Sequence, residues 1–297
     1  MRIAIVFNPG SGPRAARGAL SAVVAGLASH NHELEVIDSQ TQPDFERALR
    51  NDAASFDRVI AIGGDGTLNG VVNAVASSEN PSLPVAFVPT GRGKDAARSL
   101  PSWSASELSK GRFELAEVSA IDLMHVSLVD GTTRFGVNIS DIGLAARAAV
   151  IANGLPRWLR SLSYVAGAAR AIVPPKSFRL NITVDGEHHA IDDALLLSVC
   201  NGKTFGGGIH ISPQSSFADG LLDVVVVHNA NLIDLGLQLG KLKKGTLLDH
   251  QALLRFQGTS ITVEPVSSPW FEVDGEQLSS QPVSYEIAPM ALNWITP

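Results

Sequence analysis

The amino-acid sequence predicts two domains of different fold class, a parallel α/β domain followed by an antiparallel β domain. Short apolar runs alternate with segments of helical periodicity over residues 1–120, which is typical of β-α-β units and a parallel sheet. Over residues 121–289 the pattern changes to short β-like runs broken by Asp-Gly pairs, as in antiparallel hairpins. The length of 297 residues suits two domains of ordinary size, so we place the boundary near residue 120.

The first domain is expected to hold four parallel strands. We expect strands at residues 3–7, 34–37, 59–62 and 85–88, and helices at 15–27, at 45–50, from 67 onward and at 95–98. Ligands of open parallel sheets bind at the carboxyl ends of the strands. The turns at Asn8, Gly63 and Gly91 should therefore lie along one ligand-binding edge.

The second domain is expected to be an antiparallel β-sandwich with inserted helices. We expect strands at residues 121–129, 134–138, 179–184, 194–200, 221–227, 260–263, 270–273 and 283–287, and inserted helices at 144–172 and 232–254. The pairs Asp130-Gly131, Asp185-Gly186 and Asp274-Gly275 are typical of hairpin turns. Residues 290–297 are expected to pack back on the first domain.

Composition excludes several classes of protein. The net charge of −6 argues against a general nucleic-acid binder, because such proteins need a basic face. The one cysteine, Cys200, follows an apolar run, so no disulfide framework is expected and a reducing compartment fits. Since no uncharged apolar run approaches the length of a membrane span and the apolar start is too short for a signal peptide, we expect a cytoplasmic protein.

The stretch from residue 59 to residue 69 carries the strongest functional signal. A buried strand leads into Gly63-Gly64-Asp65-Gly66-Thr67, and apolar residues then recur at helical spacing. Glycines let a ligand approach the backbone, and the first N–H groups of the helix favour an anion, so the turn predicts a phosphate site. The carboxylate of Asp65 beside phosphates indicates a Mg²⁺ ion or a sugar hydroxyl. An ordinary tight turn is the alternative.

This run resembles the nucleotide site shared by diacylglycerol kinases, sphingosine kinases, NAD kinases and, more distantly, phosphofructokinases. Four further motifs follow the same order along the chain: Asn8-Pro9-x-Ser11-Gly12; Phe135-Gly136-Val137-Asn138 with Gly143; Phe205-Gly206-Gly207-Gly208 with Pro213 and Asp219-Gly220-Leu221; and Asp274-Gly275-Glu276. With all five in order, the chain resembles the bacterial lipid kinases of the diacylglycerol kinase and sphingosine kinase catalytic family over nearly its whole length.

The resemblance implies a fold and a reaction. The fold would be a nucleotide-binding α/β domain of the NAD kinase and phosphofructokinase type, a β-sandwich domain and an active cleft between them. The reaction would transfer the γ-phosphoryl group of ATP, with Mg²⁺, to the hydroxyl of a diacylglycerol-like or sphingoid lipid. The residues expected at the nucleotide are Asn8, Thr41, Gly63, Gly64, Asp65, Gly66, Thr67, Asn69, Arg92 and Asp95.

The resemblance also implies ligands for two cations. A water-mediated carboxylate network around Mg²⁺ would use Asp65, Asp95, Asp122 and Glu276. A second, structural metal would be held by Ser216, Asp219 and the backbone of Leu221. In each case a simpler interpretation exists, because an Asp at a helix start is often an N-cap and an Asp in a loop often shapes a turn.

The late Asp-Gly-Glu turn is the expected source of the catalytic base. Residues i and i+2 of an extended chain point the same way, so the carboxylates of Asp274 and Glu276 can face one site. Glu276 is our first choice for the base and Asp274 the second. The alternative is a plain hairpin turn, which would need no Glu.

The loop after the fourth strand departs from the family. Where relatives read Gly-Thr-x-Asn-Asp-Phe, this chain reads Gly91-Arg92-Gly93-Lys94-Asp95-Ala96. The two added positive charges would either bind phosphate directly or weaken the usual nucleotide contacts. The loop therefore leaves open a non-catalytic nucleotide or lipid sensor with a degenerate loop. An NAD kinase-like enzyme is a further alternative, against which the Asn8-Pro9-x-Ser11-Gly12 opening and the late Asp-Gly-Glu speak.

Partners follow from the same reasoning. A lipid kinase without a membrane span must meet its lipid substrate at the membrane surface, so we expect transient membrane association. Basic residues that could contact anionic lipid cluster at Arg157, Arg160 and Arg170 and at Lys241, Lys243 and Lys244. The edge of a β-sandwich can pair with a second copy, so a homodimer is an open alternative.

Overall fold

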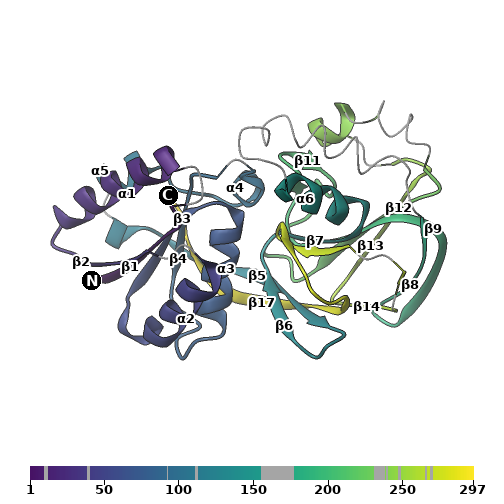
Figure 1. Cartoon of the computed structure of the whole chain (residues 1–297), viewed down its shortest axis with the longest axis horizontal. Helices are drawn as coiled ribbons and strands as arrows, with labels where there is room; N and C mark the ends of the chain where they lie inside the picture. The colour runs from purple at the N-terminus through teal and green to yellow at the C-terminus, as the bar shows by residue number, and fades with distance from the viewer. Residues whose placement is uncertain are drawn as a thin grey trace. The chain divides into compact units, whose positions relative to one another are not determined.

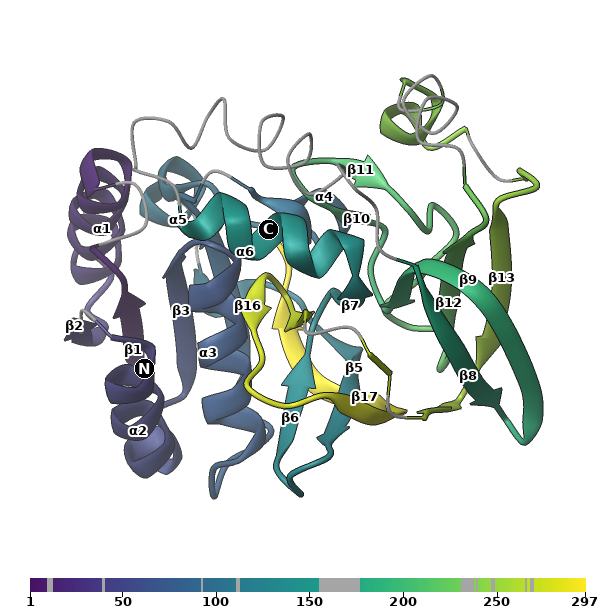
Figure 2. The ribbon, with the colours of Figure 1, turned by 45° about the vertical axis from the view of Figure 1, so that its right-hand side comes forward.

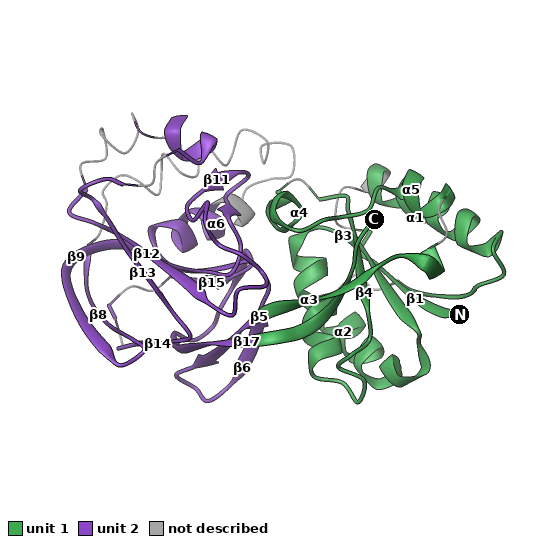
Figure 3. Cartoon of the chain, turned by 180° about the vertical axis from the view of Figure 1, so that it is seen from behind, with its two compact units in different colours: residues 1–123, 289–297 green, residues 124–288 purple. Residues whose placement is uncertain are grey.

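The computed structural model describes residues 1–9, 13–38, 41–91, 93–110, 113–154, 177–230, 238, 240–246, 249–264, 266–267 and 270–297. These divide into two compact units (Figure 3). Unit 1 comprises residues 1–123 and 289–297, and unit 2 comprises residues 124–288. Two long strands, β5 (Val118–Leu128) and β17 (Pro282–Ile295), contribute residues to both units.

The sheet of unit 1 is parallel, with strand order β2-β1-β3-β4 (Figure 1). Its strands are β1 (Arg2–Phe7), β2 (Glu33–Asp38), β3 (Arg58–Gly63) and β4 (Val85–Pro89). Nearly every residue of β1, β3 and β4 is buried, because helices cover both faces. This explains why these strands read as continuous apolar runs in the sequence.

Within the described residues of unit 1, five α-helices and two short 3₁₀ turns surround this sheet. They are α1 (Pro13–Ala28), α2 (Gln42–Asp52), η1 (Ala53–Ser55), α3 (Asp65–Ala76), α4 (Asp95–Ser99), α5 (Ala105–Lys110) and η2 (Phe113–Leu115). Helix α1 packs on α5, and α2 packs on α3. The alternate residues Ile3 and Ile5 share a buried cluster with Val23 of α1 and Leu108 of α5, so these two helices cover one face of the sheet.

The end of the chain belongs to unit 1. The last residues of β17 run parallel to β4, with Trp294 opposite Val85. The side chain of Trp294 is fully buried, and its Nε1 donates a hydrogen bond of 2.8 Å to the carbonyl oxygen of Pro101. The carbonyl oxygen of Ile295 accepts a 3.0 Å hydrogen bond from Nε1 of Trp103. The C-terminal segment is therefore part of the core of unit 1.

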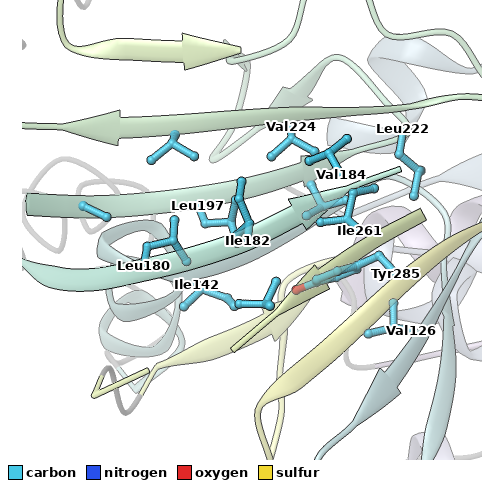
Figure 4. Packing of buried hydrophobic residues seen from close by; sticks show 14 of the residues in the cluster. Val126, Ile142, Leu180, Ile182, Val184, Leu197, Leu222, Val224, Ile261 and Tyr285 are labelled. Carbon is cyan, nitrogen blue, oxygen red and sulfur yellow. The ribbon is translucent and has the colours of Figure 1, made fainter. Parts of the chain in front are cut away.

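Unit 2 is built of antiparallel strands around the long strand β9. Besides its parts of β5 and β17, its elements are β6 (Thr133–Gly136), β7 (Ile139–Gly143), α6 (Leu144–Gly154), β8 (Phe178–Val184), β9 (Glu187–Cys200), β10 (Thr204–Phe205), β11 (Ile209–His210), β12 (Leu222–His228), β13 (Leu253–Gly258), β14 (Ser260–Val263), β15 (Phe271–Val273) and β16 (Glu276–Gln277). Strand β9 pairs with β7, β8 and β12, and helix α6 packs against β7, β15 and β16 (Figure 2). A large apolar cluster joins these strands, with Leu180, Leu197, Val224 and Tyr285 among its members (Figure 4).

The Asp-Gly hairpins are confirmed. Strands β8 and β9 meet at Asp185-Gly186, whose φ angles are 46° and 89°. Strands β15 and β16 meet at Asp274-Gly275, with φ of 52° and 83°. Positive φ at both central residues is what a type I′ turn requires, and Asp and Gly tolerate it.

Two sequence-based expectations need correction. The helix expected at 232–254 is wrong at its end, because Leu253 begins β13 and pairs along β12, a tertiary contact that local periodicity does not reveal. The strand expected at 134–138 ends at Gly136, since the next two N–H groups bind the Asp274 side chain instead of a strand. The expected helical segments 155–172 and 232–237 lie outside the described residues.

The contact between α1 and α5 gives a stability prediction. A Cβ at Gly26 would overlap the backbone of Ser109, whereas a Cβ at Gly18, in the same helix, would meet nothing within 4 Å. We expect Gly26→Ala to lower the free energy of unfolding by about 1–3 kcal/mol through overpacking. Gly18→Ala should raise it by about 0.5–1 kcal/mol through helix propensity. Urea unfolding of both variants tests this, and equal effects would contradict the close approach.

Candidate functional site

The glycine-rich turn connects β3 to α3 and contacts the loop after β4. Gly64 is extended at the N-cap of α3, with φ of −97° and ψ of −174°. The carbonyl oxygen of Gly63 accepts hydrogen bonds from the N–H groups of Thr90, at 2.8 Å, and Gly91, at 3.1 Å. A Cβ at Gly91 would lie 2.6 Å from Cα of Gly64. The two loops therefore meet backbone to backbone, which a side chain at Gly91 would prevent.

Thr67 presents its hydroxyl to this turn. Its side chain is 2% exposed, and a Cβ at Gly63 would overlap its Oγ1. Within the part of the chain that the structure describes, Oγ1 of Thr67 has no hydrogen-bond partner. A buried hydroxyl without a partner costs roughly 1–3 kcal/mol, and a ligand oxygen at the N-terminus of α3 would satisfy it.

Asp65 and Asp95 are brought together around Gly93. The side chain of Asp65 accepts hydrogen bonds from the N–H groups of Asp95, at 3.4 Å, and Ala96, at 3.2 Å. A Cβ at Gly93 would lie 2.8 Å from Oδ2 of Asp65 and 3.5 Å from Oδ2 of Asp95. Burial raises the pKa of Asp65, and the two amides and Arg98 only partly oppose that rise. Arg98 already pairs with Asp95 at 3.1 Å, so a cation at this place would mainly relieve the cost of burying Asp65.

The remaining predicted residues of unit 1 have other contacts in this structure. Asp122 is buried and accepts a 2.8 Å hydrogen bond from the N–H of Met290, a residue of β17 with φ of 52°. Asn69 is fully buried in α3, where it accepts hydrogen bonds from the Asn73 amide. The nucleotide and metal roles predicted for both residues stay predictions.

Two further nucleotide candidates lie at the start of the chain. Thr41 is exposed at the N-cap of α2 and donates its hydroxyl to Asp44. Asn8 follows β1, and its N–H donates a 3.3 Å hydrogen bond to the carbonyl oxygen of Ile62. This bond places Asn8 beside the end of β3, as the shared strand edge predicts. Ser11 and Gly12 of the first motif lie outside the described residues.

The unusual loop after β4 is only partly described, because Arg92 lies outside the described residues. Lys94 is exposed and takes the left-handed conformation, with φ of 55° and ψ of 31°. Asn adopts this conformation more easily than Lys, because its side chain bonds its own backbone. Lys94 therefore strains the backbone next to Asp95.

In unit 2, the Asp-Gly-Glu turn is held by the side chain of Asp274. Its carboxylate accepts hydrogen bonds from three consecutive N–H groups, those of Val137 at 2.7 Å, Asn138 at 2.8 Å and Ile139 at 3.2 Å. Most of its acceptor capacity is thus used by the backbone. Glu276 is the first residue of β16 and is partly buried. This geometry favours Glu276 over Asp274 as the base, although either assignment stays a prediction.

The residues predicted for a second metal shape a turn. Oγ of Ser216 accepts a 3.3 Å hydrogen bond from the N–H of Ala218, and Oδ1 of Asp219 accepts one of 3.2 Å from the N–H of Leu221. Across the described ranges, no three His, Cys, Asp or Glu side chains gather in a group that could hold a metal ion. The second cation stays a prediction, and these bonds are those of the simpler turn interpretation.

The sequence reading missed a pair of buried acids. Asp141 of β7 is 1% exposed and Glu272 of β15 is 4% exposed, and the two residues lie directly opposite each other. Burial raises the pKa of the Asp141 carboxyl. Burial together with the Asp141 charge holds the pKa of Glu272 well above its usual range. Only the register between β7 and β15 brings the two carboxyls together. The sequence pattern does not predict β7 as a strand, so it cannot reveal the pair.

The structure describes part of the basic residues that could contact anionic lipid. Among the described helices, none has the length and apolar character needed to cross a membrane. Lys241, Lys243 and Lys244 are exposed on a short helical segment. Arg157, Arg160 and Arg170 lie outside the described residues.

Comparison with known proteins matches both parts of the chain to described families. Residues 2–126 match the diacylglycerol kinase catalytic domain, and residues 138–296 match the YegS C-terminal NAD kinase beta sandwich-like domain. The crystal structure of a diacylglycerol kinase from Bacillus anthracis covers 100% of this chain and 97% of its own, at 21% identity and a TM-score of 0.72. The predicted fold class, α/β followed by a β-sandwich, is confirmed.

Two curated relatives match along most of the chain. A Stenotrophomonas maltophilia protein named "Probable lipid kinase YegS-like" is 31% identical over 256 residues, which cover 82% of this chain and 77% of that protein. A Staphylococcus haemolyticus protein named "Diacylglycerol kinase" is 26% identical over 293 residues, covering 95% of this chain and 84% of that protein. The similarity therefore extends over both units.

The strain at Lys94 can be measured. We expect Lys94→Asn to raise the free energy of unfolding by about 0.5–1 kcal/mol, because Asn tolerates the left-handed conformation. Lys94→Ala removes the same charge but keeps the strain, so it should change stability by less than about 0.5 kcal/mol. Chemical unfolding of the two variants compares them. A gain with Ala equal to that with Asn would assign the effect to charge.

Proposed function

We propose a function for this chain on the ground that it belongs to the diacylglycerol kinase catalytic family, with the YegS-type C-terminal domain in the same chain. We infer that it is a lipid kinase that transfers the γ-phosphoryl group of ATP to the hydroxyl of a diacylglycerol-like or sphingoid lipid. The names of its relatives support the lipid as acceptor. The enzyme would work in the cytoplasm and meet its substrate transiently at the membrane surface.

The observation that carries this proposal is the buried hydroxyl of Thr67 at the N-terminus of α3. A twelve-residue helix presents its first N–H groups and the positive end of its dipole at Gly64. The Thr67 hydroxyl adds a donor that no described group accepts. The site thus offers several donors to an anion with several oxygens, and a nucleotide phosphate chain has that chemistry.

Asp65 and Asp95 fit a Mg²⁺ ion bound together with the phosphates. Mg²⁺ in phosphoryl-transfer sites keeps several waters and takes only one or two carboxylates, which agrees with the pair around Gly93. When bound, the ion would neutralise the charge that develops on the transferred group. Burial raises the pKa of Asp65, and the ion would favour its ionised form.

Glu276 is the proposed general base. A bond forms between the lipid oxygen and the γ-phosphorus, the bond from that phosphorus to the ADP oxygen breaks, and the hydroxyl proton passes to the Glu276 carboxylate. Asp274 keeps the turn in place through its three backbone contacts. In the same enzyme, Asp122 would belong to the water-mediated carboxylate network around Mg²⁺. Ser216, Asp219 and the backbone of Leu221 would hold the second, structural cation.

The test is transfer of labelled phosphate from Mg-ATP to a panel of lipids dispersed in micelles. We expect label in at least one lipid with a free hydroxyl. Glu276→Gln should lower kcat by about 100-fold or more, because it removes the base, and should leave KM for ATP unchanged. Asp185→Asn is the matched control, since Asp185 also holds an Asp-Gly turn through backbone N–H groups. It should keep full kcat.

Other outcomes would point to the other functions. Phosphorylation of NAD in the absence of lipid would replace the proposal by an NAD kinase-like activity. Nucleotide binding without transfer to any lipid, unchanged in Glu276→Gln, would indicate a sensor.

Thr67 tests the nucleotide site separately from catalysis. We expect Thr67→Val to leave the free energy of unfolding unchanged or up to about 1 kcal/mol higher, because the hydroxyl has no partner to lose. ATP affinity should fall by about tenfold or more, since a hydrogen bond to a charged group contributes roughly 1.5–3 kcal/mol. Calorimetric titration and urea unfolding measure the two effects. Thr204→Val, at an equally buried threonine of unit 2, should leave ATP affinity unchanged, and unchanged affinity in Thr67→Val would contradict the site.

A further inference from the structure

Three buried polar side chains form a row across unit 2 that the proposed reaction does not use. Glu272 of β15 lies opposite Asp141 of β7, and Asp141 lies opposite Ser198 of β9. Glu272 and Asp141 are hydrogen-bonded to each other, and Ser198 donates its hydroxyl to Oδ1 of Asp141. All three are almost completely buried. Strand register therefore fixes an acid pair in a site with little water.

Such a pair holds one proton. Two adjacent carboxyl groups in a buried site cannot both ionise, because burial and mutual repulsion disfavour the second charge. Among the causes of the raised pKa of Glu272, burial comes first and the Asp141 charge second. Ser198 donates to Asp141, and burial with the Asp141 charge holds the pKa of Glu272 well above its usual range, so we assign the shared proton to Glu272, which donates it to Asp141.

The protonated Glu272 also binds the turn that bears Glu276. Its Oε2 accepts a hydrogen bond from the N–H of Gly275, the residue before Glu276. A neutral carboxyl has one O–H donor and one carbonyl acceptor. The O–H of Glu272 donates to the Asp141 carboxylate, and its carbonyl oxygen accepts from the N–H of Gly275. Asp274 holds the other side of the turn through the amides of residues 137–139. The backbone before Glu276 is thus fixed from two directions.

We propose that Glu272, oriented by Asp141, is a positioning residue that sets the direction of the Glu276 carboxylate through the N–H of Gly275. The anchoring of the turn follows from the contacts alone, whereas its effect on turnover rests on the proposed function. Misplacing a catalytic group by about 1 Å can cost on the order of 100-fold in rate, so one backbone contact can matter for kcat.

Two substitutions at Glu272 test whether its two hydrogen bonds, rather than its carboxyl group as such, hold the turn. Glu272→Gln keeps both bonds, because its amide donates to Asp141 and its carbonyl oxygen accepts from Gly275. Glu272→Leu places an apolar side chain of similar size at this position and removes both bonds. Ser140→Ala is the matched control, since Ser140 donates to the backbone oxygen of Glu272 at 2.8 Å but leaves its carboxyl and Gly275 untouched.

The experiment combines kinetics with hydrogen exchange on the full chain. In Glu272→Leu we expect kcat for lipid phosphorylation to fall about 10- to 100-fold at unchanged KM for ATP, and amide exchange to accelerate in the peptide spanning residues 271–278. Glu272→Gln should restore both values to those of the wild type. Ser140→Ala should change neither kcat nor exchange in that peptide, although it removes a buried hydrogen bond.

The outcomes distinguish this inference from the function it rests on. Wild-type kcat in a folded Glu272→Leu would overturn the positioning role, and so would a Glu272→Gln variant as slow as Glu272→Leu. If the wild type phosphorylates no lipid, the proposed function fails, and hydrogen exchange still decides on the anchor. Equal exchange in the wild type and Glu272→Leu would then overturn it.

Discussion

Backbone N–H groups that no strand or helix uses must find acceptors, and in this protein carboxylates supply many of them. Asp65 accepts the first amides of α4, Asp122 accepts the amide of Met290, and Asp274 accepts three amides between β6 and β7. Asp185 does the same for the amides of residues 259 and 260. An unpaired buried amide costs about as much as a lost hydrogen bond, so the loops depend on these acids for their conformation.

This structural use of carboxylates limits which of them can do chemistry. A carboxylate that accepts three N–H groups has little capacity left for a substrate proton, as with Asp274. One that accepts two amides at 3.2 and 3.4 Å, as Asp65 does, keeps lone pairs for a cation. Both Asp65 and Asp274 belong to motifs quoted in the sequence analysis, yet only the contacts rank them. The proposed division of roles therefore comes from hydrogen-bond geometry.

Local sequence patterns predicted most of the fold. The parallel strands of unit 1 are buried on both faces and read as apolar runs, and the Asp-Gly pairs marked the hairpins through their need for positive φ. What sequence could not show depends on distant partners. Strand β13 forms because β12 lies beside it, and β6 ends at Gly136 because Asp274, far along the chain, takes the next amides. The Asp141–Glu272 pair exists only through strand register, which no local pattern encodes.

Three locally unfavourable features of unit 1 lie at one pair of loops. Thr67 buries a hydroxyl without a described partner, Asp65 is a carboxylate whose burial raises its pKa, and Lys94 occupies the left-handed region. Along β1, β3 and β4, by contrast, propensity, burial and pairing agree. Strain and unsatisfied polar groups persist only where the surrounding structure over-determines them, and they cluster where ligands bind. A phosphate chain with its cation would relieve the cost at Thr67 and Asp65 together, whereas the strain at Lys94 has no such remedy in the described contacts. The first two features are therefore those of a binding site, and the third is local strain that Lys94 imposes on the loop before Asp95.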